Sequence, residues 1–413
     1  MKMSLLRSVD RWLGIPMTFL LSLARTCFGW MYQAGEGPGR SILFVKLAEQ
    51  GSTVLAYAAL QRAADMVGRD NVYFLAFDNN RFIVDALDVI PRENVVTIDE
   101  SSLMVAMLSS LRAVARLRRL RIDAAIDMEF FARSSAVFTL LSGARLRVGL
   151  HRFAGGGAYR GDLMTHRLVY NPHLHTSQVF YSMVEALDYP GSAFPTFDLQ
   201  LPALNCLALP RHQPNESTLA ATRDIVKTAA STDEMPPLIL LNVNCSDLLP
   251  MRKWDTDSYI ALADRLLAQY QDLYIAFTGA PSEAEEAGRI TDAVGSSRCL
   301  NLAGKTSMEQ LLALYTLSRV LVTNDSGPAH FATMTTIHTL TLFGPETPAL
   351  FAANSPRSHV IWAGLACSPC VSAYNNRVST CRDNRCMQQI TVDQVFNKTC
   401  ELYENNMELA AIA

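Results

Sequence analysis

Val320-Leu-Val-Thr-Asn-Asp-Ser-Gly-Pro-Ala-His330 joins an apolar run to a polar turn and a proline. The pattern predicts a strand, a tight turn and a helix that begins near Pro328, where the missing N–H of proline costs nothing. Asp325 or Ser326 can cap this helix, and Gly327 allows a ligand to approach the backbone closely. Because a helix N-terminus carries free N–H groups and a partial positive charge, the stretch predicts an anion site, although a simple helix cap would have the same sequence.

Strand and helix patterns alternate over most of the chain on both sides of this stretch. Apolar runs rich in β-branched or aromatic residues lie at 41–45, 72–77, 95–98 and 124–126, and again at 238–242, 273–277, 299–302, 320–323 and 339–343. Helical patterns separate them, at 101–120 in the first series and at 256–270, 282–294, 307–317 and from 328 in the second. Such alternation predicts an α/β fold with two Rossmann-like, doubly wound domains, each built on a parallel sheet with right-handed crossovers.

A proline-rich stretch at 190–237 separates the two series and contains one helical pattern at 216–230. We therefore expect an N-terminal segment (1–36), a first domain (37–200), a linker (201–236), a second domain (237–390) and a last helix (391–413) that braces the first domain. Two such domains predict a ligand cleft at the carboxyl ends of the strands. The same architecture would suit periplasmic-type binding proteins and many two-domain transferases.

The composition excludes a disordered chain and favours anionic partners for the first half. Hydrophobic residues make up 49% of the 413 residues, and charged residues 18%. Residues 1–190 contain 21 Lys/Arg and 17 Asp/Glu, whereas the remainder contains 15 and 22. The arginines at 112–121 have no acidic neighbour between Ser101 and Ile122, which indicates either contact with anionic lipid or phosphate, or a solvated helix face. No base-reading motif is present, so we expect no nucleic-acid partner.

An apolar stretch at 12–24 is bounded on each side by an arginine. It is too short to span a bilayer, which needs about 20 residues, and no small-residue cleavage site follows it. We interpret it as a segment in the membrane interface, with Trp12, Trp30 and Tyr32 at headgroup depth. The alternative is a helix packed on the protein's own core. Without a secretion signal, a cytoplasmic setting fits best.

Glycine-bearing turns end three further strands of the second series, at Thr278-Gly279, 302–305 and 343–347. In the crevice that such turns surround, an acidic residue commonly binds ribose hydroxyls, and Glu283 is our candidate. The loop after 238–242 supplies a further set of polar candidates: Asn244, Ser246, Arg252 and Lys253. The cations of this loop would neutralise a diphosphate, unless they are only a solvated pair of charges.

Several strings of the sequence occur together in one known family: Ile42-Leu-Phe-Val-Lys46 with Gly51, Arg252-Lys-Trp254, Leu302-Ala-Gly-Lys-Thr-Ser307, Val322-Thr-Asn-Asp-Ser-Gly-Pro-Ala-His330, Leu342-Phe-Gly-Pro-Glu-Thr-Pro348 and Cys367-Ser-Pro-Cys370. In these strings the chain resembles glycosyltransferase family 9, the lipopolysaccharide heptosyltransferase family, over roughly residues 40–400. The resemblance implies a GT-B fold and an inverting, metal-independent transfer from a nucleotide-sugar. ADP-heptose is the donor in the best-known members.

The resemblance also implies roles for the two domains and for particular residues. The second domain would bind the nucleotide-sugar and the first would bind the acceptor, an anionic glycolipid or glycan. Asp325, Ser326, Gly327 and His330 would hold the diphosphate and sugar of the donor, Arg252 and Lys253 its phosphates, and Glu283 its ribose. Asn244, Ser246 and Gly279 complete the expected donor-binding set.

Family members usually carry Gly-Asp in the first N-terminal loop, and the resemblance implies that this aspartate is the general base. This chain has Ser52 at that place, and serine without a partner is not a base near neutral pH. We therefore expect Glu49, in the same loop and tuned by Lys46, to accept the proton of the acceptor hydroxyl. Glu49 would otherwise only cap the following helix. Asp127 or Glu129 would then be the base, or the chain would be an inactive relative.

Four of the nine cysteines lie close together in the sequence: Cys367, Cys370, Cys381 and Cys386. Their spacing suits a tetrahedral thiolate site for a structural zinc or iron, with buried free thiols or a redox pair as the alternatives. The resemblance supports both interpretations, since Cys-Ser-Pro-Cys recurs widely in the family. The related autotransporter heptosyltransferases use four cysteines to hold iron. We expect no cofactor for catalysis itself.

The sequence thus predicts an inverting glycosyltransferase that moves a heptose or similar sugar from a nucleotide-diphosphate sugar to lipopolysaccharide or another envelope glycan. We expect it on the inner face of the bacterial cytoplasmic membrane. Two rivals stay open: a catalytically inactive nucleotide-sugar-binding scaffold, and a nucleotide-dependent epimerase of similar build.

Overall fold

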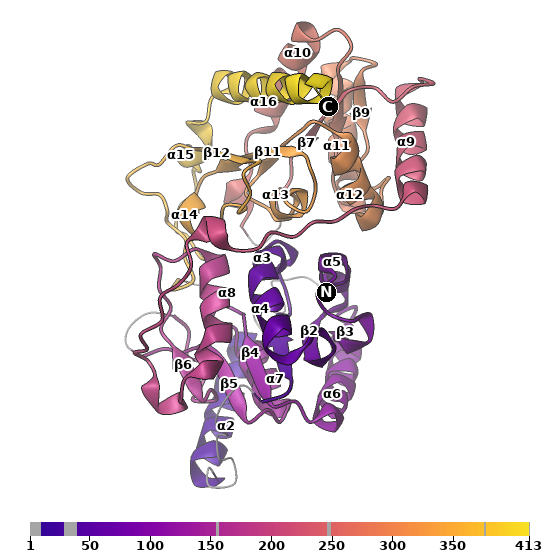
Figure 1. Cartoon of the computed structure of the whole chain (residues 1–413). Coiled ribbons are helices and arrows are strands. Elements are labelled where there is room, and N and C mark those ends of the chain that lie inside the picture. The colour runs from indigo at the N-terminus through magenta and orange to yellow at the C-terminus, as the bar shows by residue number, and fades with distance from the viewer. Residues whose placement is uncertain (1–9, 29–38, 154–156, 246–248, 376, 413) are drawn as a thin grey trace. The chain divides into compact units, whose positions relative to one another are not determined.

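The computed structural model describes residues 10–28, 39–153, 157–245, 249–375 and 377–412 (Figure 1). The chain forms two compact units, and each is described by itself. The N-terminal unit consists of Met1–Ala208 and Ser372–Val378, and the C-terminal unit of Leu209–Val371 and Ser379–Ala413. Within the described ranges, every helix is too short or too polar to cross a bilayer.

A parallel sheet with the strand order β3-β2-β1-β4-β5-β6 forms the centre of the N-terminal unit. Its strands are β1 (Ile42–Val45), β2 (Val72–Phe77), β3 (Val95–Ile98), β4 (Ala124–Asp127), β5 (Leu146–Leu150) and β6 (His166–Leu168). Its helices are α2 (Gly14–Phe28), α3 (Gln50–Leu55), α4 (Tyr57–Val67), α5 (Arg81–Leu87), α6 (Leu103–Leu120), α7 (Arg133–Leu141) and α8 (Thr176–Glu185). Every residue of β1 and β4 is buried, as expected for central parallel strands covered on both faces.

The C-terminal unit repeats this plan with the strand order β12-β11-β10-β7-β8-β9. Its strands are β7 (Leu238–Asn242), β8 (Tyr274–Phe277), β9 (Cys299–Asn301), β10 (Val320–Asn324), β11 (His338–Phe343) and β12 (Ser358–Trp362). Its helices are α9 (Glu216–Ala230), α10 (Thr256–Gln269), α11 (Ala284–Val294), α12 (Met308–Leu317), α13 (Gly327–Ala332), α14 (Pro348–Phe351), α15 (Arg385–Gln388) and α16 (Val392–Ile412). The prediction of two doubly wound α/β units is confirmed.

The strand order reverses at one point in each sheet. In the N-terminal unit, β2 and β3 lie on one side of β1, and β4, β5 and β6 lie on the other. In the C-terminal unit, the reversal falls between β7 and β10, which pair directly. Loops that leave such neighbouring strands diverge, and the space between them is where doubly wound sheets bind ligands. The two candidate sites are therefore built from the loops after β1 and β4, and after β7 and β10.

Trp254 anchors the loop after β7 in the core of the C-terminal unit. Its side chain is 1% exposed, and its ring packs edge-on against Tyr259 at a centroid distance of 4.9 Å. Its Nε1 donates a hydrogen bond to the carbonyl of Ile390 at 2.9 Å. Burial of an indole with its N–H satisfied holds this loop in one position, and with it the neighbouring cations Arg252 and Lys253.

The last helix, α16, belongs to the C-terminal unit, and its expected bracing of the N-terminal domain stays a prediction. It packs against α10, where the guanidinium of Arg265 lies 4.1 Å from the ring centroid of Phe396. The same guanidinium pairs with Asp393 at 2.5 Å. Val395 and Leu402 are buried in the core of the unit. The apolar face of α16 is therefore satisfied by the sheet that precedes it in the chain.

The N-terminal helix α2 packs on its own unit with one face and exposes apolar side chains with the other. Asp10 accepts hydrogen bonds from the backbone N–H groups of Arg133 and Ser134 at 2.9 and 2.8 Å, which joins the start of the segment to α7. On the exposed side of α2, Leu20 is 61% accessible, and Trp12, just before the helix, is 73% accessible. One face of the segment is therefore packed on the protein itself, and contact of the other face with a membrane stays a prediction. Trp30 and Tyr32 lie outside the described residues.

Candidate functional site

Arg252 is the centre of the candidate site in the C-terminal unit. Its Nη1 lies 3.6 Å from Oδ2 of Asp325 and 3.6 Å from Oε2 of Glu346. The side chains of Arg252, Asp325 and Glu346 are 11%, 4% and 2% exposed. One guanidinium is therefore shared between two nearly buried carboxylates, which come from the loops after β10 and β11. A fixed cation in such a dry setting interacts more strongly with a ligand charge than it would in water.

Asn324, at the end of β10, ties together the two loops that carry these charges. Its Nδ2 donates to the carbonyl of Val243 at 2.7 Å, and its Oδ1 accepts from the backbone N–H of Trp254 at 3.0 Å. Asn324 is fully buried, so both bonds are shielded from water. The loop after β7 is thereby held against the loop after β10, which places Arg252 beside Asp325.

The helix that the quoted stretch predicts is present as α13, but its start differs from the expectation. Ser326 is the N-cap residue, yet its side chain makes no capping bond and instead donates to the carbonyl of Asn324 at 3.2 Å. Gly327 is tightly packed, because a Cβ there would meet the ring of Phe331 at 3.0 Å and the ring would have to shift. His330 is buried on the same helix. Since α13 has only six residues, its dipole alone is a weak anion site, and the cation Arg252 is the larger electrostatic contribution.

Glu283, the candidate ribose ligand, lies in a turn that depends on Gly279. Its Oε2 accepts a hydrogen bond from the backbone N–H of Ala280 at 2.7 Å, and a Cβ at Gly279 would meet this oxygen at 2.6 Å. Burial raises the pKa of Glu283, while the bond from Ala280, a hydrogen bond from Asn244 and the charge of Lys253 oppose the rise. The structure therefore brings together the predicted residues Asn244, Lys253, Gly279 and Glu283.

Four of the predicted donor-binding residues carry charges that act on the thiol of Cys245. Burial raises the pKa of Cys245, and the neighbouring charges that act on it are those of Arg252, Lys253, Asp325 and Glu283. Lys253 also forms an ion pair with Glu286. Ser246, the remaining predicted member, lies outside the described residues. Residues from three separate loops of the C-terminal unit thus share one site.

Glu346 is a site residue that the sequence interpretation missed. It follows β11 in the glycine-bearing turn at 343–347, where the sequence pattern indicated no role for Glu346 itself. Its side chain is 2% exposed and faces Arg252. A buried carboxylate at the carboxyl end of a strand is an indication of function, but the sequence does not show that Glu346 is buried.

In the N-terminal unit, the carboxylates after β4 are held by internal partners. Asp127 is fully buried, forms an ion pair with Arg160 and accepts from Ser135 Oγ at 3.1 Å. Burial raises the pKa of Asp127 to about 6, although Arg160 and these hydrogen bonds favour the charged form. Glu129 lies 3.5 Å from Nζ of Lys46 and accepts from the backbone N–H of Ala48 at 2.9 Å. Lys46 is therefore paired with Glu129, whereas we expected it to act on Glu49.

Glu49 presents its carboxylate beside Ser52. Its Oε2 accepts from the hydroxyl of Ser52 at 3.3 Å, and its Oε1 forms an ion pair with Arg377. Glu49 occupies the N-cap position of α3, but its side chain makes no bond to the amides of that helix. Glu49 therefore has the position of a helix cap, but its side chain does not cap the helix. The side chain of Glu49 is 23% exposed, so water has access to it.

The cysteine cluster does not form the expected metal site. Over the ranges that the structure describes, no three His, Cys, Asp or Glu side chains are grouped so that they could hold a metal ion. No disulfide joins any of the nine cysteines, all of which the structure describes, and of the four clustered ones Cys386 is buried while Cys367 and Cys381 are exposed. Burial raises the pKa of Cys386, and the neighbouring Cys370 and Cys381 raise it further. The four side chains are therefore not arranged as a metal site in the described residues.

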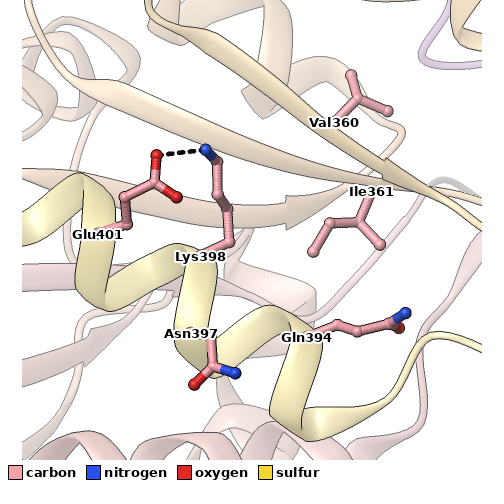
Figure 2. Close-up of a pocket in the computed structure, with 6 residues that line it drawn as sticks. All are labelled: Val360, Ile361, Gln394, Asn397, Lys398 and Glu401. Carbon is pink, nitrogen blue, oxygen red and sulfur yellow. Dashed lines mark hydrogen bonds and ion pairs between the residues drawn. The ribbon is translucent and has the colours of Figure 1, made fainter.

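A surface depression lies between β12 and α16 and contains none of the predicted residues (Figure 2). It is lined by Val360, Ile361, Gln394, Asn397, Lys398 and Glu401. Its cation, Lys398, pairs with Glu401 at 2.5 Å, and the remaining lining is neutral. Without a cluster of converging charged groups, this depression is a weaker ligand site than the surroundings of Arg252.

The sequence of this chain is similar to sequences of known heptosyltransferases. A profile of glycosyltransferase family 9 (heptosyltransferase) matches residues 110–378. The chain is 26% identical over 163 residues to lipooligosaccharide heptosyltransferase 2 of Campylobacter jejuni, a match that covers 38% of this chain and 48% of that protein. It is 32% identical over 116 residues to lipopolysaccharide heptosyltransferase 2 of Salmonella typhimurium, which covers 27% and 32%. The chain therefore matches half or less of the length of these relatives.

The fold is similar over a larger share of the chain. The solved structure of E. coli ADP-heptose lps heptosyltransferase II superimposes with a TM-score of 0.68 at 19% sequence identity. The superposition covers 89% of this chain and 99% of that chain. The expected GT-B fold is thereby confirmed.

Proposed function

Because this chain belongs to glycosyltransferase family 9, the heptosyltransferase family, we propose that it is an inverting glycosyltransferase of envelope-glycan synthesis. It moves a heptose or similar sugar from a nucleotide-diphosphate sugar to lipopolysaccharide or another envelope glycan. The E. coli protein of similar fold is described as an ADP-heptose enzyme, which makes ADP-heptose the first donor to test.

Arg252 is the observation that carries this proposal. Transfer from a nucleotide-sugar leaves a diphosphate on which negative charge develops, and catalysis needs a fixed positive group at that place. A guanidinium offers five N–H donors and keeps its proton, so it suits a diphosphate better than an ammonium group does. Arg252 is nearly buried at the reversal point of the sheet, and Asp325 and Glu346 hold it there before a donor binds.

In the proposed reaction, Glu49 takes the proton from the acceptor hydroxyl while the hydroxyl oxygen attacks C1 of the donor sugar. The bond from C1 to the diphosphate oxygen breaks on the opposite side of the sugar, which inverts the configuration at C1. The electron pair of that bond passes to the diphosphate beside Arg252. Glu283 and Asn244 bind the ribose, and His330 binds the sugar or diphosphate. Arg252 and Lys253 supply the positive charge that a metal ion provides in other transferases.

A panel of nucleotides tests the donor site of this proposal. The thermal unfolding midpoint of the purified protein should rise with ADP and with ADP-heptose, because a ligand at 100 times its Kd stabilises the folded state by about 2.7 kcal/mol. UDP and GDP, which differ from ADP only in the nucleoside, test which nucleobase the site prefers. Arg252→Gln should bind ADP at least about tenfold more weakly, since it loses a charge-assisted contact worth about 1.5–3 kcal/mol.

Two further variants and one assay complete this test. Arg252→Lys keeps the charge, and Arg289→Gln removes an exposed arginine of the same unit as the matched control. Transfer is followed as ADP release from ADP-heptose with a lipid-linked acceptor. Binding without turnover for every donor would favour the inactive scaffold, and sugar conversion without any acceptor would favour the epimerase. Full ADP affinity in Arg252→Gln would contradict the assigned donor site.

The acceptor side of the proposal includes contact with the cytoplasmic face of the membrane. The first half of α6 exposes Leu103, Met107 and Leu111 at 56%, 55% and 64%, and these residues lie along one side of the helix. Its second half exposes Arg112 and Arg116, without an acidic residue on the helix. Apolar side chains followed by arginines suit the acyl boundary and the anionic headgroups of a bilayer. The exposed face of α2 adds a second apolar surface to the same unit.

Vesicle binding should depend on these α6 side chains. The triple variant Leu103→Ser, Met107→Ser and Leu111→Ser should reduce partition onto phosphatidylglycerol-containing vesicles at least about tenfold, because each apolar side chain contributes roughly 1.5–3 kcal/mol when buried. Arg112→Gln with Arg116→Gln should weaken binding to anionic vesicles only. Val169→Ser changes an exposed apolar residue elsewhere in the unit and should have no effect. Unchanged sedimentation of the triple variant would remove α6 from the membrane contact.

A further inference from the structure

Residues 372–378 belong to the N-terminal unit, although the chain on both sides of them belongs to the C-terminal unit. Tyr374 holds this segment in place. Its hydroxyl donates to the carbonyl of Tyr170 at 2.7 Å, and its ring packs edge-on against the Tyr170 ring at 5.1 Å. The ring of Phe131 lies 6.3 Å away on another side. The segment, which lies between Cys370 and Cys381 in the sequence, is therefore packed into the N-terminal unit by specific contacts.

Arg377 of this segment forms an ion pair with Glu49. The side chains of Arg377 and Glu49 are 16% and 23% exposed, so the pair is partly shielded from water. Arg377 Nη1 engages Oε1 of Glu49, and Ser52 Oγ engages Oε2 at 3.3 Å. Both carboxylate oxygens thus have a donor, which fixes the plane of the carboxylate.

Backbone strain is concentrated at this place. Glu49, Phe131 and Arg377 have φ angles of 66°, 61° and 56°, in the left-handed region that residues other than glycine rarely adopt. In the described part of the chain, only three further non-glycine residues have positive φ: Asp88, Arg121 and Ser231. Strained residues persist where the surrounding structure holds them, and they cluster at functional sites. Here the strain occurs in Glu49 and Arg377, which form one ion pair, and in Phe131, which packs against Tyr374 of the segment.

We propose that Arg377 is a positioning residue for the general base. Residues 372–378 complete the acceptor site because they bring Arg377 to Glu49. This inference rests on the proposed role of Glu49. A guanidinium suits the task because it keeps its proton throughout the reaction, so it orients Glu49 without competing for the transferred proton. In free solution a glutamate side chain samples several rotamers, and a misplacement of about 1 Å costs on the order of 10²-fold in rate. Arg377 and Ser52 together remove this freedom.

A double-mutant cycle tests the inference with the full-length protein. Arg377→Gln should lower kcat for sugar transfer by on the order of 10²-fold and leave the Kd for ADP unchanged. Arg377→Lys should recover part of this loss, because it restores the charge without the second N–H donor. The double variant Glu49→Gln with Arg377→Gln should be no slower than Glu49→Gln alone, since the arginine acts through the carboxylate.

Tyr374→Phe is the matched control for simple docking of the segment. It removes the hydrogen bond to Tyr170 and leaves the charge of Arg377 in place. If Arg377 only docked the segment, Tyr374→Phe would cause a similar loss of kcat, and the losses from Glu49→Gln and Arg377→Gln would multiply. Either result overturns the inference. A wild-type protein that binds ADP but transfers no sugar would instead overturn the proposed function, so the two failures are distinguishable.

Discussion

Replacement of Glu49 by glutamine is expected to lower kcat for sugar transfer by about 10²–10⁴-fold, the usual contribution of a general base. Glutamine keeps the size of the side chain and a carbonyl oxygen for Ser52, but it cannot accept the acceptor proton. The Kd for ADP should stay unchanged, because the proposed donor residues lie in the C-terminal unit and Glu49 in the N-terminal unit. Single-turnover transfer and ADP titration of the same preparation measure the two quantities.

Two controls define what the Glu49 result means. Glu93→Gln removes an exposed carboxylate of the same unit and should leave transfer unchanged. Ser52→Ala removes the hydroxyl that donates to Oε2 of Glu49, and it should cost less than Glu49→Gln because the base itself remains. Turnover in Glu49→Gln that equals the wild-type rate would rule Glu49 out as the base. In that case Glu129, which is bonded to Lys46 and Ala48, would be the next carboxylate to test.

Replacement of Arg160 by methionine is expected to destabilise the N-terminal unit by about 3–5 kcal/mol, because it leaves Asp127 buried without its cation. Arg160 and Asp127 are 2% and 0% exposed, so water cannot take the place of the lost partner. Urea unfolding monitored by circular dichroism measures the change. The exposed pair of Arg69 and Asp88, at 51% and 82%, gives the matched comparison. Arg69→Met should cost only about 0–1 kcal/mol.

The loss in Arg160→Met should also depend on pH. The pKa of Asp127 is about 6 in the folded protein, against an ordinary value of 3.8, so the folded state binds more protons than the unfolded state between these values. The contribution of Asp127 to stability therefore falls as the pH rises through 6. Removal of Arg160 raises the folded pKa further, so the variant should be more destabilised at pH 8 than at pH 5. The double variant Asp127→Asn with Arg160→Met should lose this dependence. An equal loss at both pH values would contradict the buried-charge explanation.

The repeating strand and helix patterns were sufficient to predict most of the fold. The runs at 72–77, 95–98 and 238–242 coincide with β2, β3 and β7, and the helical pattern at 216–230 coincides with α9. These elements were predictable because buried parallel strands are continuous apolar runs and amphipathic helices repeat at a period near 3.6. Both signals depend only on residues that are close in the sequence.

Three strands were not predicted because their sequences do not show what covers them. β5 contains Arg147, which is 2% exposed and donates to the carbonyls of Leu163 and Ala144 at 2.7 and 2.6 Å. A buried arginine in a strand is stable only with such acceptors, and the sequence cannot show their position. β6 has only three residues, and β12 at the sheet edge is largely half-buried or exposed. Neither has the continuous apolar run that identified the other strands.

The candidate site divides in the same way. The sequence alone determined the two doubly wound units, the strand ends that carry Glu49, Arg252 and Asp325, and the family to which the chain belongs. Only the tertiary structure decided which charged residues form pairs, namely Glu346 with Arg252 and Arg377 with Glu49. It also decided that α16 belongs to the C-terminal unit. The physical reason is that local conformation depends on neighbours a few residues away, whereas the partner of a charge is set by distance in space between loops up to hundreds of residues apart.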